Sequence, residues 1–246
     1  MLKKSLCTSA LLLGLSPFVN ATIVEFQTSH GNFQVNLFDQ STPKTVANFL
    51  QYVDEQHYTN SVIHRVVPDF VVQGGGFTFE SDWPLTRIAT NSAIINEPIY
   101  SNVKGTIAMA KLGDNPNSAT DQWFFNLKNN SSNLDQQNGG FTVFGQVIGD
   151  GMNVVESIAN QSLCQDIPMI NYSDDNCNSL ATPGIENFVS INQIVIVDSS
   201  EVTDANLSPV KNTSLTPSED SSSSGGSFIW LSLFGLLPLT IRKLIF

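Results

Sequence analysis

Basic side chains are scarce in this chain of 246 residues. It has 11 Lys and Arg against 22 Asp and Glu, which gives a formal net charge of −11 at pH 7. Nucleic-acid binding needs clustered Lys and Arg, so we expect no nucleic-acid partner. Histidine is rarer still, with three residues scattered along the chain. This scatter, and the lack of a Cys-x-x-Cys pair, indicates that there is no metal site.

Cysteine is equally rare: the chain has three, and Cys7 lies in an apolar N-terminal segment. Cys164 and Cys177 remain, in a polar, turn-rich part of the sequence that is typical of a surface loop. In an oxidising compartment this pair would form a disulfide worth about 3 kcal/mol in the chain-entropy model. Two unpaired thiols are the alternative.

Residues 1–21 have the pattern of a secretory signal peptide. Two lysines precede an apolar core at residues 6–15, which is too short to span a bilayer. Residues 19–21 suit cleavage, so we expect the mature chain to begin at Thr22 and the protein to be exported to the periplasm or the cell surface. An uncleaved N-terminal anchor is the alternative.

The C-terminal part contains a different kind of segment. Residues 199–227 are rich in Ser, Thr, Asp, Asn and Pro without an apolar period, so we expect a disordered linker that ends in Gly-Gly-Ser. Residues 228–246 are apolar apart from a basic pair, and the apolar run is short for a bilayer span of about 20 residues. This order resembles the bacterial GlyGly-CTERM sorting tails, in which the helix holds the protein in the membrane until a protease cuts near the glycines. A permanent anchor and a eukaryotic glycolipid-anchor signal are the alternatives.

Between these ends we expect one folded domain over residues 22–198. Alternating apolar residues at 33–37 predict a half-buried strand. Thr42 and Pro43 suit an N-cap and a first helical turn, and the apolar residues that follow at helical spacing predict an amphipathic helix. A second short helix is predicted over residues 152–159. Further strands are predicted at residues 62–67, 70–73, 105–110, 123–127, 142–147 and 188–197. Many short strands with two helices suggest a closed antiparallel barrel, although periodicity alone does not separate a barrel from a sandwich.

The most specific signal lies in residues 62–77, which read VIHRVVPDFVVQGGGF. Arg65 lies five residues before Phe70, and Gln73 lies three residues after it. A Pro-Asp turn interrupts the two apolar segments, so these side chains are expected to come from neighbouring strands. Three more runs accompany this one: GTIAMA at residues 105–110, SATDQWFFN at 118–126 and VFGQV at 143–147.

In these runs the chain resembles the cyclophilins, the peptidyl-prolyl cis-trans isomerases, and most of all the periplasmic bacterial ones, which share the three glycines at 74–76 and an extended loop at 134–141. The resemblance covers nearly all of residues 22–197. It implies a closed eight-stranded antiparallel β-barrel capped by two α-helices, with the active site in a groove on the outer face. It also implies that the substrates are unfolded or extended proline-containing polypeptides.

The chemistry explains the residue types. Rotation about an X-Pro bond faces a barrier near 18–20 kcal/mol because the amide bond is partly double. No covalent bond breaks, so the reaction needs no nucleophile, metal or cofactor, and the catalyst must favour the twisted amide. The resemblance assigns catalysis to Arg65 as hydrogen-bond donor, Phe70 as proline contact and Gln73 as the residue that orients Arg65. It assigns substrate binding to Val71, Ala110, Gln122, Phe124, Leu134 and Phe141.

Some residues depart from the family pattern. Asn133 stands where many eukaryotic cyclophilins have a tryptophan that contributes to cyclosporin binding, so we expect weak inhibition. Phe141 stands where the family has His or Tyr, and Val71 replaces the common methionine, which should alter substrate preference. His64, next to Arg65, is interpreted as structural because isomerisation needs no base.

We therefore expect an exported isomerase that assists protein folding, acts as a monomer, and associates with the membrane through its C-terminal segment. A non-catalytic proline-peptide binding or chaperone module on the same barrel is the alternative. A surface adhesin is a third possibility that rests only on the C-terminal tail.

Overall fold

The structure is a computed structural model, and it describes residues 22–81, 83–179, 182–200, 203 and 207–215. The predicted signal peptide, with Cys7, and the apolar segment at 228–246 lie outside the described residues. Among the residues that are described, no helix is long and apolar enough to cross a membrane. In the same ranges, no group of three or more His, Cys, Asp or Glu side chains could hold a metal ion.

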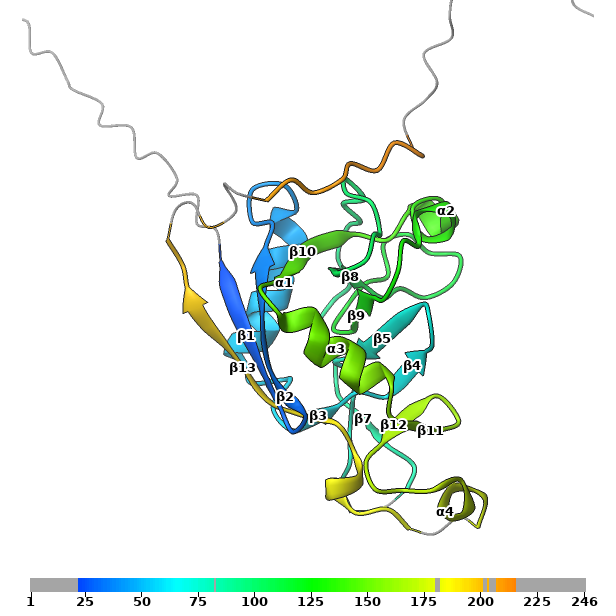
Figure 1. Cartoon of the computed structure of the whole chain (residues 1–246). Helices are drawn as coiled ribbons and strands as arrows, with labels where there is room; N and C mark the ends of the chain where they lie inside the picture. The colour runs from blue at the N-terminus through cyan, green and yellow to red at the C-terminus, as the bar shows by residue number, and fades with distance from the viewer. Residues whose placement is uncertain (1–21, 82, 180–181, 201–202, 204–206, 216–246) are drawn as a thin grey trace, which may run out of the picture. The chain divides into compact units, whose positions relative to one another are not determined.

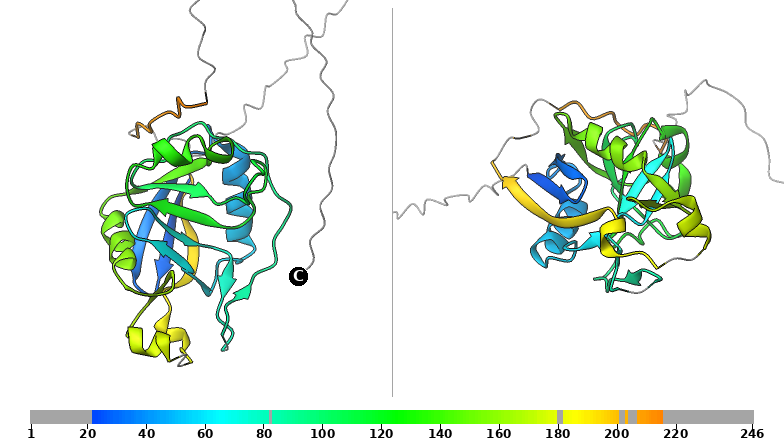
Figure 2. Two further views of the ribbon diagram at one scale, coloured as in Figure 1. Left: turned by 90° about the vertical axis from the view of Figure 1, so that its right-hand side faces the viewer. Right: turned by 60° about the horizontal axis from the view of Figure 1, so that its bottom comes forward.

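The described residues form mainly β structure with a few short helices. Eleven strands make one antiparallel sheet in the order β4-β5-β9-β8-β10-β2-β1-β13-β3-β6-β7, and β11 and β12 form a separate hairpin. Figures 1 and 2 show that the sheet curls round on itself. The strands are β1 (Ile23–Thr28), β2 (Gly31–Leu37), β3 (Ser61–Val62), β4 (Arg65–Val67), β5 (Val71–Gly74), β6 (Phe77–Thr78), β7 (Thr86–Arg87), β8 (Thr106–Met109), β9 (Trp123–Asn126), β10 (Val143–Ile148), β11 (Ser162–Cys164), β12 (Ile167–Met169) and β13 (Ser190–Asp198).

Two longer helices lie on opposite sides of this sheet (Figure 2, left). They are α1 (Pro43–Asp54) and α3 (Gly151–Ala159), at the positions predicted from the sequence. Four shorter elements lie in the loops: α2 (Ser131–Leu134), α4 (Asp174–Asn178) and the 3-10 helices Gln137–Gly139 and Ile185–Asn187. The helix α1 ends at Asp54, and the chain turns with a positive φ at Gln56 two residues later.

The concave side of the sheet holds an aromatic core. Phe26 on β1 lies opposite Phe33 on β2, and their rings stack with centroids 5.0 Å apart. Phe49 of α1 packs on the same cluster, and all three side chains are buried. Each such burial stabilises the fold by about 1.5–3 kcal/mol. This interior is therefore filled with side chains.

The start of α1 differs from the sequence prediction. Thr42 does precede the helix, but its hydroxyl donates to the Phe38 carbonyl at 3.2 Å and does not cap the helix. The carboxylate of Glu97 takes that role: it accepts from the backbone N–H of Thr45 at 2.9 Å and from that of Lys44 at 3.4 Å. A negative charge also suits this end of the helix dipole. The cap comes from 52 residues away, beyond the reach of a local motif.

The predicted disulfide is confirmed. Cys164, at the end of β11, is bonded to Cys177 in α4, with their Cα atoms 5.6 Å apart. The closed segment also touches the main sheet, because the carbonyl of Asp166 accepts from the N–H of Val66 at 2.6 Å. The disulfide-closed segment is therefore anchored beside β4, the strand that begins at Arg65.

Part of the predicted linker contacts the domain. Lys211 forms an antiparallel bridge with Tyr100, and two backbone hydrogen bonds flank it: Ser101 N–H to the Val210 carbonyl at 2.8 Å, and Asn212 N–H to the Ile99 carbonyl at 2.9 Å. This segment is drawn in orange in Figure 1. The domain boundary at residue 198 and the linker over 199–227 stay predictions.

Candidate active site

Three polar side chains form a hydrogen-bonded row on neighbouring strands. The ladder of β4 and β5 places Arg65 directly opposite Gln73. Nη1 of Arg65 donates to Oε1 of Gln73 at 3.2 Å, and Nε2 of Gln73 donates to Oε1 of Gln122 at 2.8 Å. Since the amide of Gln73 is held on both sides, it fixes the plane in which the guanidinium lies. The guanidinium keeps further N–H donors for a ligand.

An apolar cluster lies beside this row. Strand alternation separates it from the interior: Phe124 points to this face, whereas its neighbours Trp123 and Phe125 point into the core. Val71 and Leu134 are buried in the same cluster, and Phe70, Ala110 and Phe141 are only partly buried against it. The rings of Phe124 and Phe141 meet edge to face, with centroids 5.8 Å apart. The structure thus gathers all the apolar site residues that were singled out in the sequence.

The three glycines allow the strands to approach closely. A Cβ on Gly76 would lie 2.7 Å from Cγ of Gln122, and one on Gly75 would lie 2.8 Å from the carbonyl oxygen of Asp121. Gly75 also has a φ of +93°, which side chains disfavour. Glycine at these positions therefore lets Asp121 and Gln122 approach β5 closely, where Gln122 bonds to Gln73.

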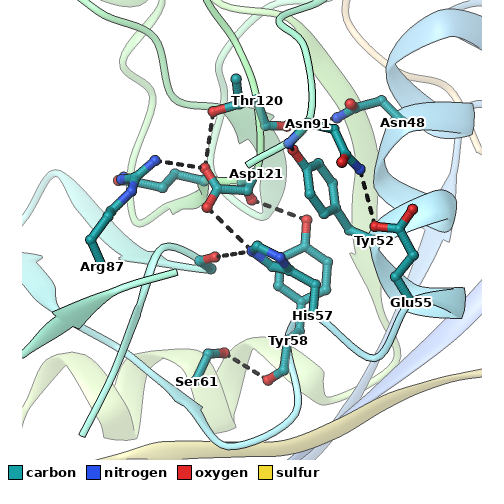
Figure 3. A network of polar contacts seen from close by, with 12 residues as sticks. Asn48, Tyr52, Glu55, His57, Tyr58, Ser61, Arg87, Asn91, Thr120 and Asp121 are labelled. Atoms are coloured by element: carbon teal, nitrogen blue, oxygen red, sulfur yellow. Dashed lines mark hydrogen bonds and ion pairs between the residues drawn. The ribbon is translucent and has the colours of Figure 1, made fainter. Parts of the chain in front are cut away.

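Directly before Gln122 in the sequence is Asp121, a buried carboxylate to which sequence reasoning assigned no role; Figure 3 shows its contacts. The carboxylate of Asp121 is fully buried. Nη2 of Arg87 and Oγ1 of Thr120 each donate to its Oδ1 at 3.0 Å. Nε2 of His57 lies 3.2 Å from its Oδ2 and 3.2 Å from the Gly75 carbonyl, so this nitrogen carries the proton.

This network fixes the backbone at the start of β9, because the carbonyl of Asp121 also accepts from the hydroxyl of Tyr58 at 3.0 Å. Gln122 is the next residue and inherits that position. The signal in the sequence is the acidic residue itself: a carboxylate beside a strand of aromatic residues must be paired if it is buried.

Burial lowers the pKa of two basic side chains near the site. Burial lowers the pKa of His64 to about 4, although hydrogen bonds with Gln122 and the Val62 backbone act in the opposite direction. His64 is therefore neutral near pH 7. Burial also lowers the pKa of Lys111 to about 8. Its Nζ donates to the carbonyl of Gly140 at 2.7 Å and lies 4.8 Å from the centre of the Phe141 ring, a contact that sequence reasoning missed.

Arg65 supplies the guanidinium of the row, and its side chain remains 39% exposed. Asp166 approaches it from the disulfide-closed segment, with its Oδ2 3.9 Å from Nε of Arg65. At this distance, and with the carboxylate itself 66% exposed, the pair is a weak one. The guanidinium stays available to a ligand, next to an apolar surface that can receive a proline ring.

Comparison with known proteins agrees with this geometry. The family model for cyclophilin-type peptidyl-prolyl cis-trans isomerases matches residues 23–173. A peptidyl-prolyl cis-trans isomerase of Acinetobacter baylyi is 39% identical over 164 residues, which cover 65% of this chain and 84% of that protein. Isomerase B of Escherichia coli is 38% identical over 157 residues, covering 59% and 92%.

Among solved structures, a cyclophilin-type isomerase of Cryptosporidium parvum superposes with a TM-score of 0.51 at 21% identity, over 72% of this chain and 98% of that one. This similarity supports the fold. The sequence matches also support the family and its reaction, because they cover most of the length of bacterial isomerases. The chain belongs to the cyclophilin-type peptidyl-prolyl cis-trans isomerase family, and its reaction is the cis–trans isomerisation of X-Pro peptide bonds.

Proposed function

We propose that this isomerase assists the folding of exported proteins by binding extended proline-containing segments and stabilising their twisted X-Pro amide. The observation that carries the proposal is the guanidinium of Arg65, held by Gln73 at the edge of the apolar cluster around Phe124. One solved structure of the Cryptosporidium parvum relative was determined in the presence of the dipeptide Ala-Pro, which supports proline-containing ligands for the family.

The mechanism follows from the electronic change in the amide. In the planar forms the nitrogen lone pair is delocalised, and twisting the C–N bond localises it on nitrogen. A donor that Gln73 holds in place gains a hydrogen bond to the twisted amide, so it lowers the barrier. Phe70 and Phe124 would hold the proline ring while the preceding carbonyl rotates. The neutral His64 contributes no charge to this step.

The test is a protease-coupled or conformational assay on a short X-Pro peptide, with Arg65→Ala as the comparison. We expect the variant to lose most of the rate but to retain peptide binding, because the apolar cluster is intact. A wild-type protein that is no faster than Arg65→Ala would leave the non-catalytic binding module as the function.

We also propose that the protein is exported and acts as a monomer, with residues 1–21 removed. The disulfide between Cys164 and Cys177 supports export, since such bonds persist in oxidising compartments.

The apolar segment at 228–246 would hold the protein in the membrane until it is cut near the two glycines, as in the GlyGly-CTERM tails. Mass spectrometry of the mature protein tests both ends: survival of residues 228–246 in a secreted form would exclude processing. Light scattering tests the monomer.

Finally, we propose that the curled sheet closes as the eight-stranded barrel of the family. What supports closure is the run from β3 to β4, which contacts strands near both ends of the strand order. Ile63 N–H donates to the Val189 carbonyl at 2.9 Å, and His64 N–H donates to the Gln73 carbonyl at 3.2 Å. A closed barrel predicts slow amide hydrogen exchange at both residues, whereas an open edge predicts fast exchange.

A further inference from the structure

Residues 207–215, which we term the C-terminal strap, lie beyond the part of the chain that matches the family model. The strap runs along residues 99–101, joined by the bridge between Tyr100 and Lys211 and by the two backbone hydrogen bonds given above. It also makes side-chain contacts, and these lead to the active site.

The first contact is polar. Nδ2 of Asn212 donates to the backbone carbonyl of Asp135 at 3.0 Å. The carboxylate of Asp135 is buried and accepts from Ser101 Oγ at 2.6 Å and from the backbone N–H of Asn102 at 2.8 Å. The strap, residues 99–102 and Asp135 therefore form one hydrogen-bonded unit.

That unit holds both ends of the loop that carries the apolar wall of the site. Asp135 directly follows Leu134, which is buried in the active-site cluster. At the other end, Nδ2 of Asn102 donates to the carbonyl of Phe141 at 3.1 Å. The N–H of Phe141 in turn donates to the carbonyl of Leu134 at 2.8 Å, which closes the loop.

The second contact is apolar. Leu207 packs against the cluster that contains Phe124 and Leu134. Leu215 covers Gly140, since its Cδ1 lies 2.9 Å from the point where a Cβ on that glycine would be. Gly140 immediately precedes Phe141, so the strap contacts the loop directly before one of its two wall residues.

We propose that the C-terminal strap is a positioning segment for substrate binding: it holds Leu134 and Phe141 at the distance from Phe124 that a proline ring requires. The inference rests on the isomerase function proposed above. It assigns an active-site role to a part of the chain outside the family match. Cutting near Gly225 would leave the strap in the mature protein, so the role would survive processing of the tail.

The experiment uses the full chain with Asn212→Ala and Leu207→Ala, each alone. The matched control is Val210→Ala, whose side chain is 55% exposed and whose backbone hydrogen bond to Ser101 is kept. A loosened wall weakens the binding of ground state and transition state alike, so we expect KM for an X-Pro peptide to rise about fivefold, the factor for one ordinary hydrogen bond, with kcat changed less than twofold. The control should leave both values unchanged.

Hydrogen exchange separates this role from general stabilisation. We expect the N–H of Phe141 to exchange faster in both strap variants, while the N–H of Val147 in β10 stays protected. A lowered melting temperature with unchanged KM and unchanged exchange at Phe141 would overturn the proposal. If either variant fails to fold, Leu215→Ala removes the contact with Gly140 from a side chain that is 41% exposed, and gives the same readouts. If the wild-type protein has no isomerase activity, the proposed function is wrong. The effect of the strap on the loop can still be tested in that case, because hydrogen exchange at the Phe141 N–H does not depend on activity.

Discussion

The buried carboxylate of Asp121 offers the sharpest test of how this site is held together. Replacing it with asparagine keeps the shape and removes the charge. The new amide oxygen can still accept from Thr120 and Arg87, but the bond from the guanidinium is no longer charge-assisted. The amide NH2 group takes the place of Oδ2 and faces the protonated Nε2 of His57, so one donor meets another.

The magnitude follows from these contacts. A hydrogen bond to a charged group contributes about 1.5–3 kcal/mol, and the lower end applies here because the Arg87 side chain is 44% exposed. The bond that His57 loses is partly replaced, since its Nε2 can still donate to the Gly75 carbonyl. We therefore expect Asp121→Asn to lower the free energy of unfolding by about 2 kcal/mol, or the melting temperature by about 4–8 °C for a domain of this size.

Activity should fall as well, because Gln122 follows Asp121 and holds Gln73. A fall in kcat/KM of about 3- to 10-fold corresponds to a loss of roughly 1 kcal/mol in transition-state stabilisation. The measurements are urea unfolding and the peptide isomerisation assay. Asp175→Asn is the matched control, because it removes a charge from an exposed carboxylate in the disulfide-closed segment.

A double-mutant cycle with Arg87→Gln tests the reasoning directly. We expect a coupling energy of about 1 kcal/mol or more between Arg87 and Asp121, since the two are in contact. A coupling energy near zero, or an equal loss of stability in Asp175→Asn, would refute the role given to the buried charge.

Other predictions concern pH, the disulfide and inhibition. The pKa of His64 is about 4 in the folded protein and about 6.5 in the unfolded chain, so the unfolded chain binds more protons between these pH values. The free energy of unfolding should therefore fall by up to about 3 kcal/mol as pH drops from 6.5 to 4. In His64→Gln, the urea midpoints measured from pH 4 to pH 7 should depend less on pH. Replacing Cys164 and Cys177 with serine should cost about 3 kcal/mol in the same unfolding assay, and unchanged midpoints would contradict this. Cyclosporin should inhibit the protein weakly, and Asn133→Trp should strengthen inhibition in a titration of isomerase activity. A wild-type inhibition constant as low as that of tryptophan-bearing members would contradict the last prediction.

The sequence predicts the parts of this fold that short-range patterns determine. The alternation at Phe33 and Val35 indicates β2, and the helical spacing after Pro43 indicates α1. Strands β6 and β7 have two residues each, too few for any period to show. The predicted strand over residues 62–67 is divided into β3 and β4 at Ile63 and His64, where its pairing passes from β13 to β5.

The candidate site also has parts that short-range patterns predict and parts that they do not. Arg65 and Gln73 face each other because their strands pair in a register that the spacing of a short turn determines, so their proximity could be predicted. Contacts between distant segments could not: Arg87 pairs with Asp121, the residue before Gln122, and elsewhere in the fold Glu97 caps the start of α1. No local pattern encodes such pairs.

The loop that carries Leu134 and Phe141 is the clearest case. Its two wall residues could be assigned from the family resemblance, but its supports could not. One of them, Asn212, lies in a Ser- and Asp-rich stretch whose composition indicates a disordered linker. Composition measures how much apolar surface a segment can bury by itself, and residues 207–215 bury little of their own. Their contacts complete hydrogen bonds and apolar packing that the domain already presents, so these contacts depend on the partner surface and could not be predicted from the segment's own sequence.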